Sequence, residues 1–342
     1  MRRNTIIFTT IAAAGVLLLL LNLALGSVSI PFDAIWGIIT GDYQGDIVWQ
    51  NIVIKSRLPT VITAICAGAG LSISGLQMQT LFRNPLAGPS ELGISAGASL
   101  GVALVILLSG SILNEALIKQ GLFGEVALTV AAICGALVVM VIILSISRYA
   151  KGSVTLLIVG VMIGYIATAL IGVLKFFSSD EDVKGYVIWG LGSFSKVSGG
   201  NIQPFVICSL ILIALSFLLI KRLNLMLLGD NYARSLGQDV RSTRLWTIIS
   251  SCSITAVITA YCGPIIFLGL AVPHLCRMIF VTSDHRLLMP AVTLVGAVLA
   301  MLCNLIARMP GIEGALPINS VTALIGAPIV LSVIFERRSS IS

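Results

Sequence analysis

The stretch IQPFVICSLILIALSFLLI, residues 202–220, indicates the fold class of this chain. It holds no charged residue, and a helix needs about 20 mostly apolar residues to cross a bilayer. Residues 221–244 follow it with a charged segment, and a second apolar run begins at residue 245. This order predicts two membrane-spanning helices joined by a charged connection.

The composition extends this prediction to the whole chain. Of its 342 residues, 57% are hydrophobic and only 10% are charged, whereas soluble domains carry roughly 25% charged residues. We therefore predict an all-α, polytopic integral membrane protein with a single transmembrane domain over residues 1–342. The expected spans are 5–26, 60–81, 91–110, 122–147, 153–176, 202–220, 245–262, 264–281, 288–307 and 317–335.

The basic start and apolar run of residues 1–27 also fit a signal peptide. That run exceeds the usual 7–15 residues of a signal peptide, which favours a retained span. Of the 21 Lys and Arg residues, fourteen fall on the side that carries both termini and seven on the other side. The positive-inside rule then places both termini and residues 221–244 in the cytoplasm.

The remaining patterns exclude several functions. The positive charges lie in short gaps and form no basic stripe, so nucleic acid is not an expected partner. The seven cysteines are scattered without a C-x-x-C pair and are expected to be apolar filler. The chain has no P-loop, no H-E-x-x-H motif and no acid near a span centre, so no catalytic or metal-binding residue is expected. A partner subunit would then supply the energy for transport, the alternative being an ion-coupled secondary transporter.

Residues 229–237, GDNYARSLG, predict a short helix inside the charged segment. Asp230 suits its N-cap and Gly237 its C-terminal stop. Tyr232, Ala233 and Leu236 share one face of this helix by their spacing. Such a helix suits docking to another protein, and equally suits lying on lipid headgroups.

Seven segments, in order along the chain, resemble the permease subunits of type II ABC importers, which take up iron-siderophores, haem and vitamin B12. The segments are RLP (57–59), AGAGLSISGLQMQTLFRNPLAGPSELGISAGASLG (67–101), WGLGSF (189–194), LNLMLLGDNYARSLG (223–237), CGPIIFLGLAVPHLCRMI (262–279), DHRLLMP (284–290) and VTALIGAPI (321–329).

The resemblance implies a ten-span permease fold and a homodimer in a bacterial cytoplasmic (inner) membrane. It also implies two ATP-binding subunits, which hold ATP and Mg, and an extracytoplasmic substrate-binding protein. This chain would bind no cofactor and would not be an enzyme. Its cargo would be a siderophore, haem or cobalamin. We call residues 221–244 the coupling segment, and the resemblance implies that the ATP-binding subunit docks on residues 223–241 within it.

The resemblance also assigns roles to single residues. Arg57 and Arg308 match outer arginines that dock the binding protein, although each also suits anchoring a helix end. The cytoplasmic gate corresponds to Gly152, Ser153 and Val154, which also suit a simple tight turn. The positions matching the ATPase-docking surface are Leu223, Leu228, Gly229, Asp230, Ala233, Arg234, Leu236, Gly237 and Arg241.

A further set of motif residues is expected to have structural roles. It comprises Arg83, Asn84, Pro85, Pro89, Gly263, Pro264, Pro273, His274 and Arg277. The glycines at 68, 70, 75, 93, 97 and 101 are expected to be helix-packing sites. The chain departs from the family pattern at Thr60, Asn304, Ala315 and Asn319, which all lie in its outer half.

Overall fold

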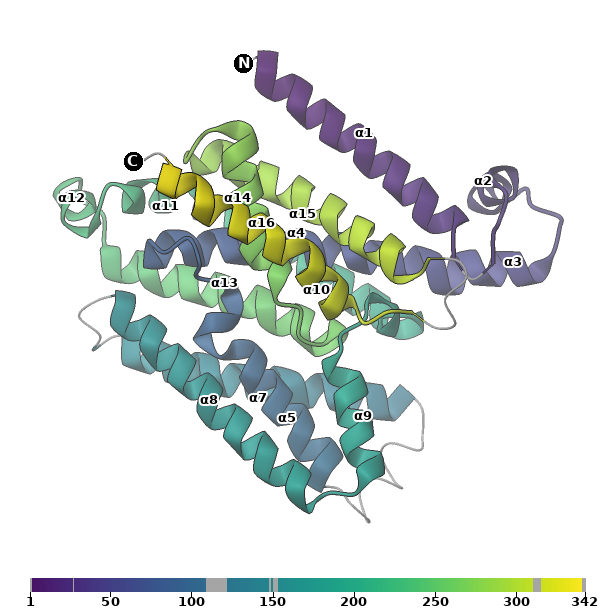
Figure 1. Ribbon diagram of the computed structural model, residues 1–342, viewed down its shortest axis with the longest axis horizontal. Coiled ribbons are helices and arrows are strands. Elements are labelled where there is room, and N and C mark those ends of the chain that lie inside the picture. The colour runs from purple at the N-terminus through teal and green to yellow at the C-terminus, as the bar shows by residue number, and fades with distance from the viewer. Residues whose placement is uncertain are drawn as a thin grey trace.

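The computed structural model is all-helical in the part of the chain that it describes (Figure 1). That part comprises residues 2–26, 28–108, 122–147, 149, 153–309 and 315–339. Its long helices are α1 (Arg2–Ala24), α4 (Leu58–Phe82), α5 (Ile94–Leu108), α7 (Leu122–Ser147), α8 (Ser153–Phe177), α10 (Ile202–Phe217), α13 (Val240–Cys262), α14 (Phe267–Phe280), α15 (His285–Ala307) and α16 (Ile318–Ser339).

These helices correspond one by one to the ten predicted spans. Within the described residues, seven helices are long and apolar enough to cross a membrane. Shorter apolar helical stretches occur in α5, α14 and α16. The break predicted at residues 262–265 is real, because α13 ends at Cys262 and α14 begins at Phe267. The all-α, multi-pass prediction is thereby confirmed.

Shorter helices connect the long ones. They are α2 (Phe32–Thr40), α3 (Ile47–Asn51), the π-helix η1 (Ile52–Arg57), the 3₁₀ turns η2 (Pro89–Leu92), η3 (Phe194–Lys196) and η4 (Gly199–Asn201), and α9 (Asp180–Gly190), α11 (Ile220–Leu227) and α12 (Asp230–Ser235). In Figure 1, α12 lies at one end of the long axis, and α2 and α3 lie at the other. The coupling segment and the segment before α4 therefore lie at opposite ends of the bundle.

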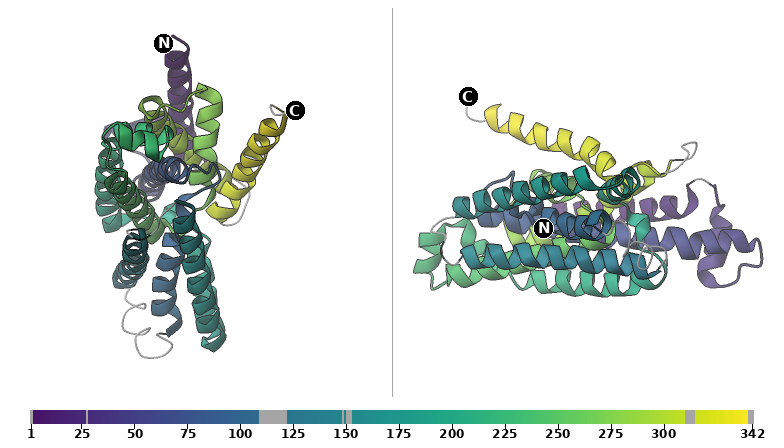
Figure 2. Two further views of the ribbon diagram at one scale, coloured as in Figure 1. Left: turned by 90° about the vertical axis from the view of Figure 1, so that its left-hand side faces the viewer. Right: turned by 90° about the horizontal axis from the view of Figure 1, so that it is seen from below.

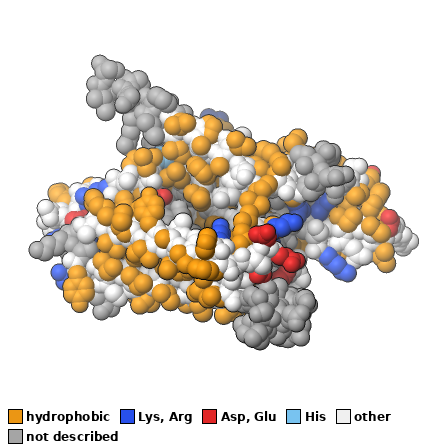
Figure 3. Space-filling model, turned by 60° about the horizontal axis from the view of Figure 1, so that its bottom comes forward, with side chains coloured by type: hydrophobic (Ala, Val, Ile, Leu, Met, Phe, Trp, Pro, Cys, Tyr) orange, Lys and Arg blue, Asp and Glu red, His pale blue; other side chains and the backbone are white. Residues whose placement is uncertain are grey.

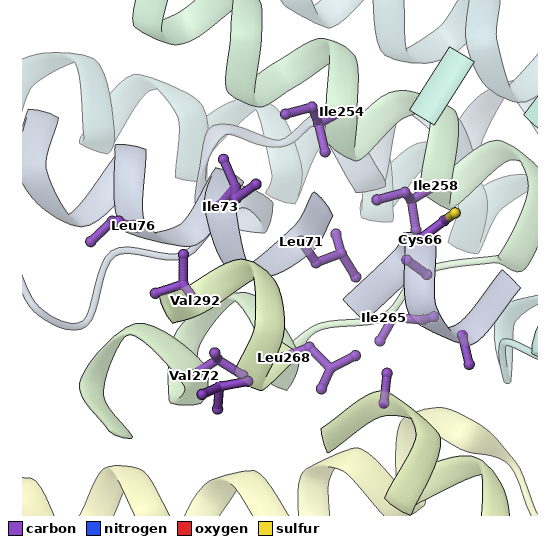
Figure 4. Packing of buried hydrophobic residues seen from close by; sticks show 14 of the residues in the cluster. Cys66, Leu71, Ile73, Leu76, Ile254, Ile258, Ile265, Leu268, Val272 and Val292 are labelled. Carbon is purple, nitrogen blue, oxygen red and sulfur yellow. The ribbon is translucent and has the colours of Figure 1, made fainter. Parts of the chain in front are cut away.

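Helix α4 lies at the centre of the bundle. Of the most apolar window in the helical stretch Ile47–Phe82, 89% is buried, compared with 17–22% for α1, α7, α8 and α10. Figure 4 shows its side chains Leu71, Ile73 and Leu76 among residues from α13, α14 and α15. Any movement of α4 must therefore displace the three helices packed against it.

Glycines allow this close packing. A Cβ at Gly75 of α4 would lie 1.7 Å from the Gly269 carbonyl oxygen of α14. A Cβ at Gly68 would lie 2.2 Å from the Gly296 oxygen of α15. Both distances are far below the distance at which two non-bonded atoms can touch, so the backbones meet only because these residues have no side chain. The packing role predicted for these two glycines is confirmed.

The outer surface of the bundle is apolar. Figure 3 shows a face covered mainly by hydrophobic side chains, on which the charged ones are few and lie in small groups. On α8 the exposed residues Ile158, Met162, Tyr165 and Ile166 form such a surface. The C-terminal end of α16 stands away from the bundle (Figure 2). In the first half of the same helix, Leu324 is 77% exposed. In a membrane these faces meet lipid or another apolar protein surface.

Candidate functional site: the coupling segment

The coupling segment contains the short helix α12, which has a glycine of positive φ on either side. Gly229 precedes α12 with φ +106°, a conformation that side chains other than hydrogen disfavour. Gly237 follows α12 with φ +81°. Its N–H donates to the Arg234 carbonyl, and the Gln238 N–H donates to the Ala233 carbonyl. These two bonds form a Schellman motif, so the prediction that Gly237 ends the helix is confirmed.

The expected N-cap role of Asp230 is wrong. Asp230 is the first residue of α12 and makes no side-chain cap. Its carboxylate instead accepts hydrogen bonds from Arg83 Nη2 at 2.6 Å and from Arg244 Nη2 at 3.3 Å. Arg83 ends α4 and Arg244 lies in α13. Asp230 therefore links α12 to two long helices. Arg83 is 147 residues away from Asp230 in the sequence, so no local pattern reveals this contact.

The coupling segment buries one set of its candidate docking residues and exposes another. Leu223 is 1% exposed and Ala233 is fully buried. These two residues pack against the bundle, so the prediction that they contact a partner is corrected. Leu228 and Leu236 are instead 57% and 54% exposed, and so is Tyr232, at 60%, which was not among the predicted docking residues. Arg234 and Arg241 are also exposed, so this surface combines apolar side chains with cations.

The end of α4 and the turn after it are joined to α14 by side-chain hydrogen bonds. Asn84 Oδ1 accepts from the Leu86 N–H at 2.9 Å, and His274 Nε2 donates to the Pro85 carbonyl at 2.6 Å. Arg277 donates to Gln79 Oε1 at 2.6 Å. These bonds join α14 to the end of α4. The structural role expected for Asn84, Pro85, His274 and Arg277 agrees with these contacts.

A hollow of about 440 Å³ separates the coupling segment from α14. Arg83 and Leu227 line it from one side, and Arg277 and Met278 from the other. Its lining holds two arginines and no acid. Beside this open space, the coupling segment is attached to the bundle both by the packing of the buried Leu223 and Ala233 and by the ion pairs of Asp230.

At the opposite end, two of the sequence motifs, 189–194 and 262–279, meet at Asn319. The Ser193 N–H donates to the Cys262 carbonyl at 2.8 Å, and the Asn319 N–H to the Leu191 carbonyl at 3.4 Å. Asn319 Oδ1 accepts from the Ile266 N–H at 3.4 Å. The side chain that departs from the family pattern here therefore holds the start of α14 in place.

One of the two outer arginines, Arg57, differs from the expectation. Arg57 is 4% exposed, and its guanidinium donates hydrogen bonds to the carbonyl oxygens of Leu23 and Val28. A binding protein cannot reach it in this structure, so the docking role predicted for Arg57 is corrected to an anchor for the end of α1. Arg308 is half-buried and donates to Thr60 Oγ1 at 3.2 Å.

Replacing Arg57 by Leu is expected to destabilise the fold. The Leu23 and Val28 carbonyls would lose their charged donor. The Leu23 carbonyl is buried, so leaving it without a donor costs about 1–3 kcal/mol, whereas Val28 is 41% exposed and its carbonyl can bond to water. Thermal unfolding in detergent should show a lower midpoint for Arg57→Leu and an intermediate one for Arg57→Lys. An unchanged midpoint combined with weaker binding-protein association would restore the docking assignment.

The gate residues lie at the edge of the described structure. Gly152 falls outside the described residues, and α8 begins at Ser153. Val154 is 64% exposed. No group of three or more His, Cys, Asp or Glu that could hold a metal occurs among the described residues. All seven cysteines are free thiols, in agreement with their role as apolar filler.

Comparison with known proteins identifies relatives along the full bundle. The FecCD transport family model matches residues 14–336. The chain is 37% identical over 330 residues to the hemin transport system permease protein HmuU of Yersinia pestis, covering 94% of each. It is 33% identical over 339 residues to the vitamin B12 import system permease protein BtuC of Citrobacter koseri, covering 98% of this chain and 96% of the relative.

A solved structure has the same arrangement of helices. It is described as an inward-facing conformation of a metal-chelate type ABC transporter. The superposition has a TM-score of 0.82 at 29% sequence identity, covering 96% of this chain and 99% of the other. The shared fold therefore extends to the coupling segment as well as to the spans.

Proposed function

This chain belongs to the FecCD transport family and is the permease of an ABC importer, and on that premise we propose how it works. It moves an iron chelate, either a siderophore or haem, or else cobalamin, across a bacterial cytoplasmic membrane. A separate ATP-binding subunit, which carries ATP and Mg, supplies the energy by docking on the coupling segment.

The surface of the coupling segment is the observation that carries this proposal. Leu228, Tyr232 and Leu236 are more than half exposed at one end of the bundle, beside Arg234 and Arg241. Apolar side chains grouped on a surface outside the spans favour a protein partner. The capped, glycine-delimited backbone also presents them in a fixed geometry, which lowers the entropy cost of docking.

The remaining parts of the assembly follow from the same orientation. We place the coupling segment and both termini on the cytoplasmic side, in accordance with the distribution of Lys and Arg. The end that carries α2, α3 and Arg308 then faces outward, toward a substrate-binding protein. Two copies of the chain form a homodimer that recruits two ATP-binding subunits, and the exposed faces of α8 and α16 are available for lipid or the second copy.

The names of two relatives support a large metal chelate as the cargo, although a molybdate import permease of Haemophilus influenzae also matches, at 33% identity. A hemin permease and a vitamin B12 permease match this chain at similar identity. Both cargoes are large macrocyclic metal complexes, and siderophores are metal chelates of comparable bulk. Because no described residue forms a metal-binding cluster, the permease is expected to pass the intact chelate rather than the bare ion.

The test is a mild-detergent purification of the tagged chain from its own cells, followed by mass spectrometry. Recovery of a P-loop ATPase at a near 1:1 ratio supports the proposal. Reconstituted vesicles then take up hemin, cobalamin or a ferric siderophore only when ATP is present. Recovery of the chain alone, with uptake that collapses with the ion gradient, would instead establish an ion-coupled secondary transporter.

A further inference from the structure

A chain of side-chain hydrogen bonds runs from the coupling segment to the last turn of α4, the central helix of the bundle. It starts at Asn224 on α11, passes through His285 at the start of α15, and ends at Thr80 on α4. Asn224 Oδ1 lies 2.8 Å from His285 Nδ1, and His285 Nε2 lies 2.8 Å from Thr80 Oγ1. His285 is 1% exposed and Thr80 is 4% exposed, whereas Asn224 is half-buried, so the bond between His285 and Thr80 is the more shielded of the two.

The orientation of the Asn224 amide is fixed by two other contacts. Its Nδ2 donates to Asp284 Oδ1 at 2.6 Å, and its Oδ1 accepts from the backbone N–H of His285 at 2.8 Å. Hydrogen bonds from the Arg286 backbone and from Asn224 lower the pKa of Asp284, so its carboxylate is ionised and only accepts. A backbone N–H can only donate. Both neighbours therefore require the same amide orientation.

That orientation determines the tautomer of His285. Because Asn224 Oδ1 only accepts, His285 Nδ1 must carry a proton. Nε2 of the neutral ring then accepts, and the Thr80 hydroxyl is its donor. The Leu76 carbonyl also lies 2.8 Å from Thr80 Oγ1, but donation to it would leave the Nε2 and Oγ1 lone pairs facing each other. With the ring neutral, Asn224, His285 and Thr80 each have one consistent role, and the Thr80 hydroxyl donates to His285 Nε2 rather than to the Leu76 carbonyl.

These bonds connect the coupling segment to the most deeply packed helices. Asn224 satisfies the His285 N–H, one of the amides that a helix start leaves without an intrahelical partner. A shift of α11 therefore acts directly on the first residue of α15. Through Thr80 it also acts on α4, whose Gly68 meets α15 at the Gly296 backbone. Thr80 and Leu227 both line the hollow described above. Beside it, the bonds of Asn224, His285 and Thr80 connect α11 directly to α15 and α4.

We propose that His285, held as the Nδ1–H tautomer by Asn224, is the positioning residue that transmits movement of the coupling segment to α4 and α15. This inference rests on the proposed function, in which an ATP-binding subunit moves the coupling segment. His285 touches neither ATP nor cargo. Its effect is on the ratio of cargo moved to ATP hydrolysed, and not on docking of the ATPase.

The first test measures that ratio in vesicles containing the complete complex, with hemin, cobalamin and a ferric siderophore as probes. Thr80→Val removes the hydroxyl at nearly constant volume and should lower cargo moved per ATP by about tenfold, as expected for one buried hydrogen bond. Thr80→Ser retains the hydroxyl and should restore the wild-type ratio. In both variants the ATPase should remain bound. A wild-type ratio in Thr80→Val, or equal losses in Val and Ser, would overturn the proposal.

The second test is made on the protein without any substitution and requires no transport measurement. The chain has only two histidines, and their neighbours demand opposite tautomers. His274 Nε2 faces the Pro85 carbonyl, so it carries a proton there, whereas His285 carries one on Nδ1. Solid-state NMR of isotope-labelled histidine in the full-length protein should show one ring of each kind. Two Nε2–H rings would refute the inference while leaving the ATPase co-purification, and thus the proposed function, unaffected.

Discussion

Replacing Asp230 by Lys is expected to abolish coupled uptake while leaving the protein folded in the membrane. The new cation would face Arg83 and Arg244, which Asp230 now holds at 2.6 and 3.3 Å. Each of these partly exposed pairs contributes only about 0.2–1 kcal/mol. That loss is too small to unfold a bundle packed around α4, but it is enough to release α12 from the ends of α4 and α13.

The measurement is ATP-driven uptake of hemin, cobalamin and a ferric siderophore, together with the amount of ATPase that co-purifies. Asp230→Asn keeps the shape of the side chain without its charge and should give an intermediate loss. Arg234→Glu is the matched surface change, because Arg234 has no ion pair among the described residues and its reversal leaves the Asp230 contacts intact. Reduced ATPase binding in Arg234→Glu supports docking at this surface. Wild-type uptake by both charge-reversal variants would contradict the docking assignment.

Gly75→Ala is expected to have the largest effect on folding. The added methyl group would lie 1.7 Å from the Gly269 carbonyl oxygen. Both partners are backbone atoms of packed helices, so neither can rotate away. Overpacking of a close-packed interior typically costs 1–3 kcal/mol and sometimes more, and a backbone clash of this depth is expected to reach or exceed about 3 kcal/mol.

The chain provides its own control for this substitution. Gly172 also lies within a long helix, α8, but a Cβ there meets no atom within 4 Å. Gly172→Ala should therefore keep or slightly raise stability, because alanine favours helix by roughly 0.5–1 kcal/mol. Thermal unfolding and yield of the purified protein compare the two variants. Equal behaviour of Gly75→Ala and Gly172→Ala would show that α4 and α14 separate more easily than this packing implies.

The corrections in the candidate site have one physical origin. Arg57 and Leu223 were placed on docking surfaces because a motif does not say which way a side chain points. Asp230 was expected to cap its own helix because capping is a local preference, whereas Arg83 is distant in sequence and adjacent only in the folded bundle. The ion pairs and the solvent exposure of these side chains depend on residues that are distant in the sequence and become neighbours only in the folded structure.

The sequence alone determined the all-helical, multi-pass class, the position of each span and the break at residues 262–265. Apolar length and Gly-Pro breaks fix these features locally, since a helix in lipid must satisfy its own backbone hydrogen bonds. Only the tertiary structure decided that Asp230 joins Arg83 to Arg244, that Arg57 is buried, and that Asn224 fixes the tautomer of His285. Each of these depends on directional contacts between helices, whose distances are set by packing and not by the order of residues along the chain.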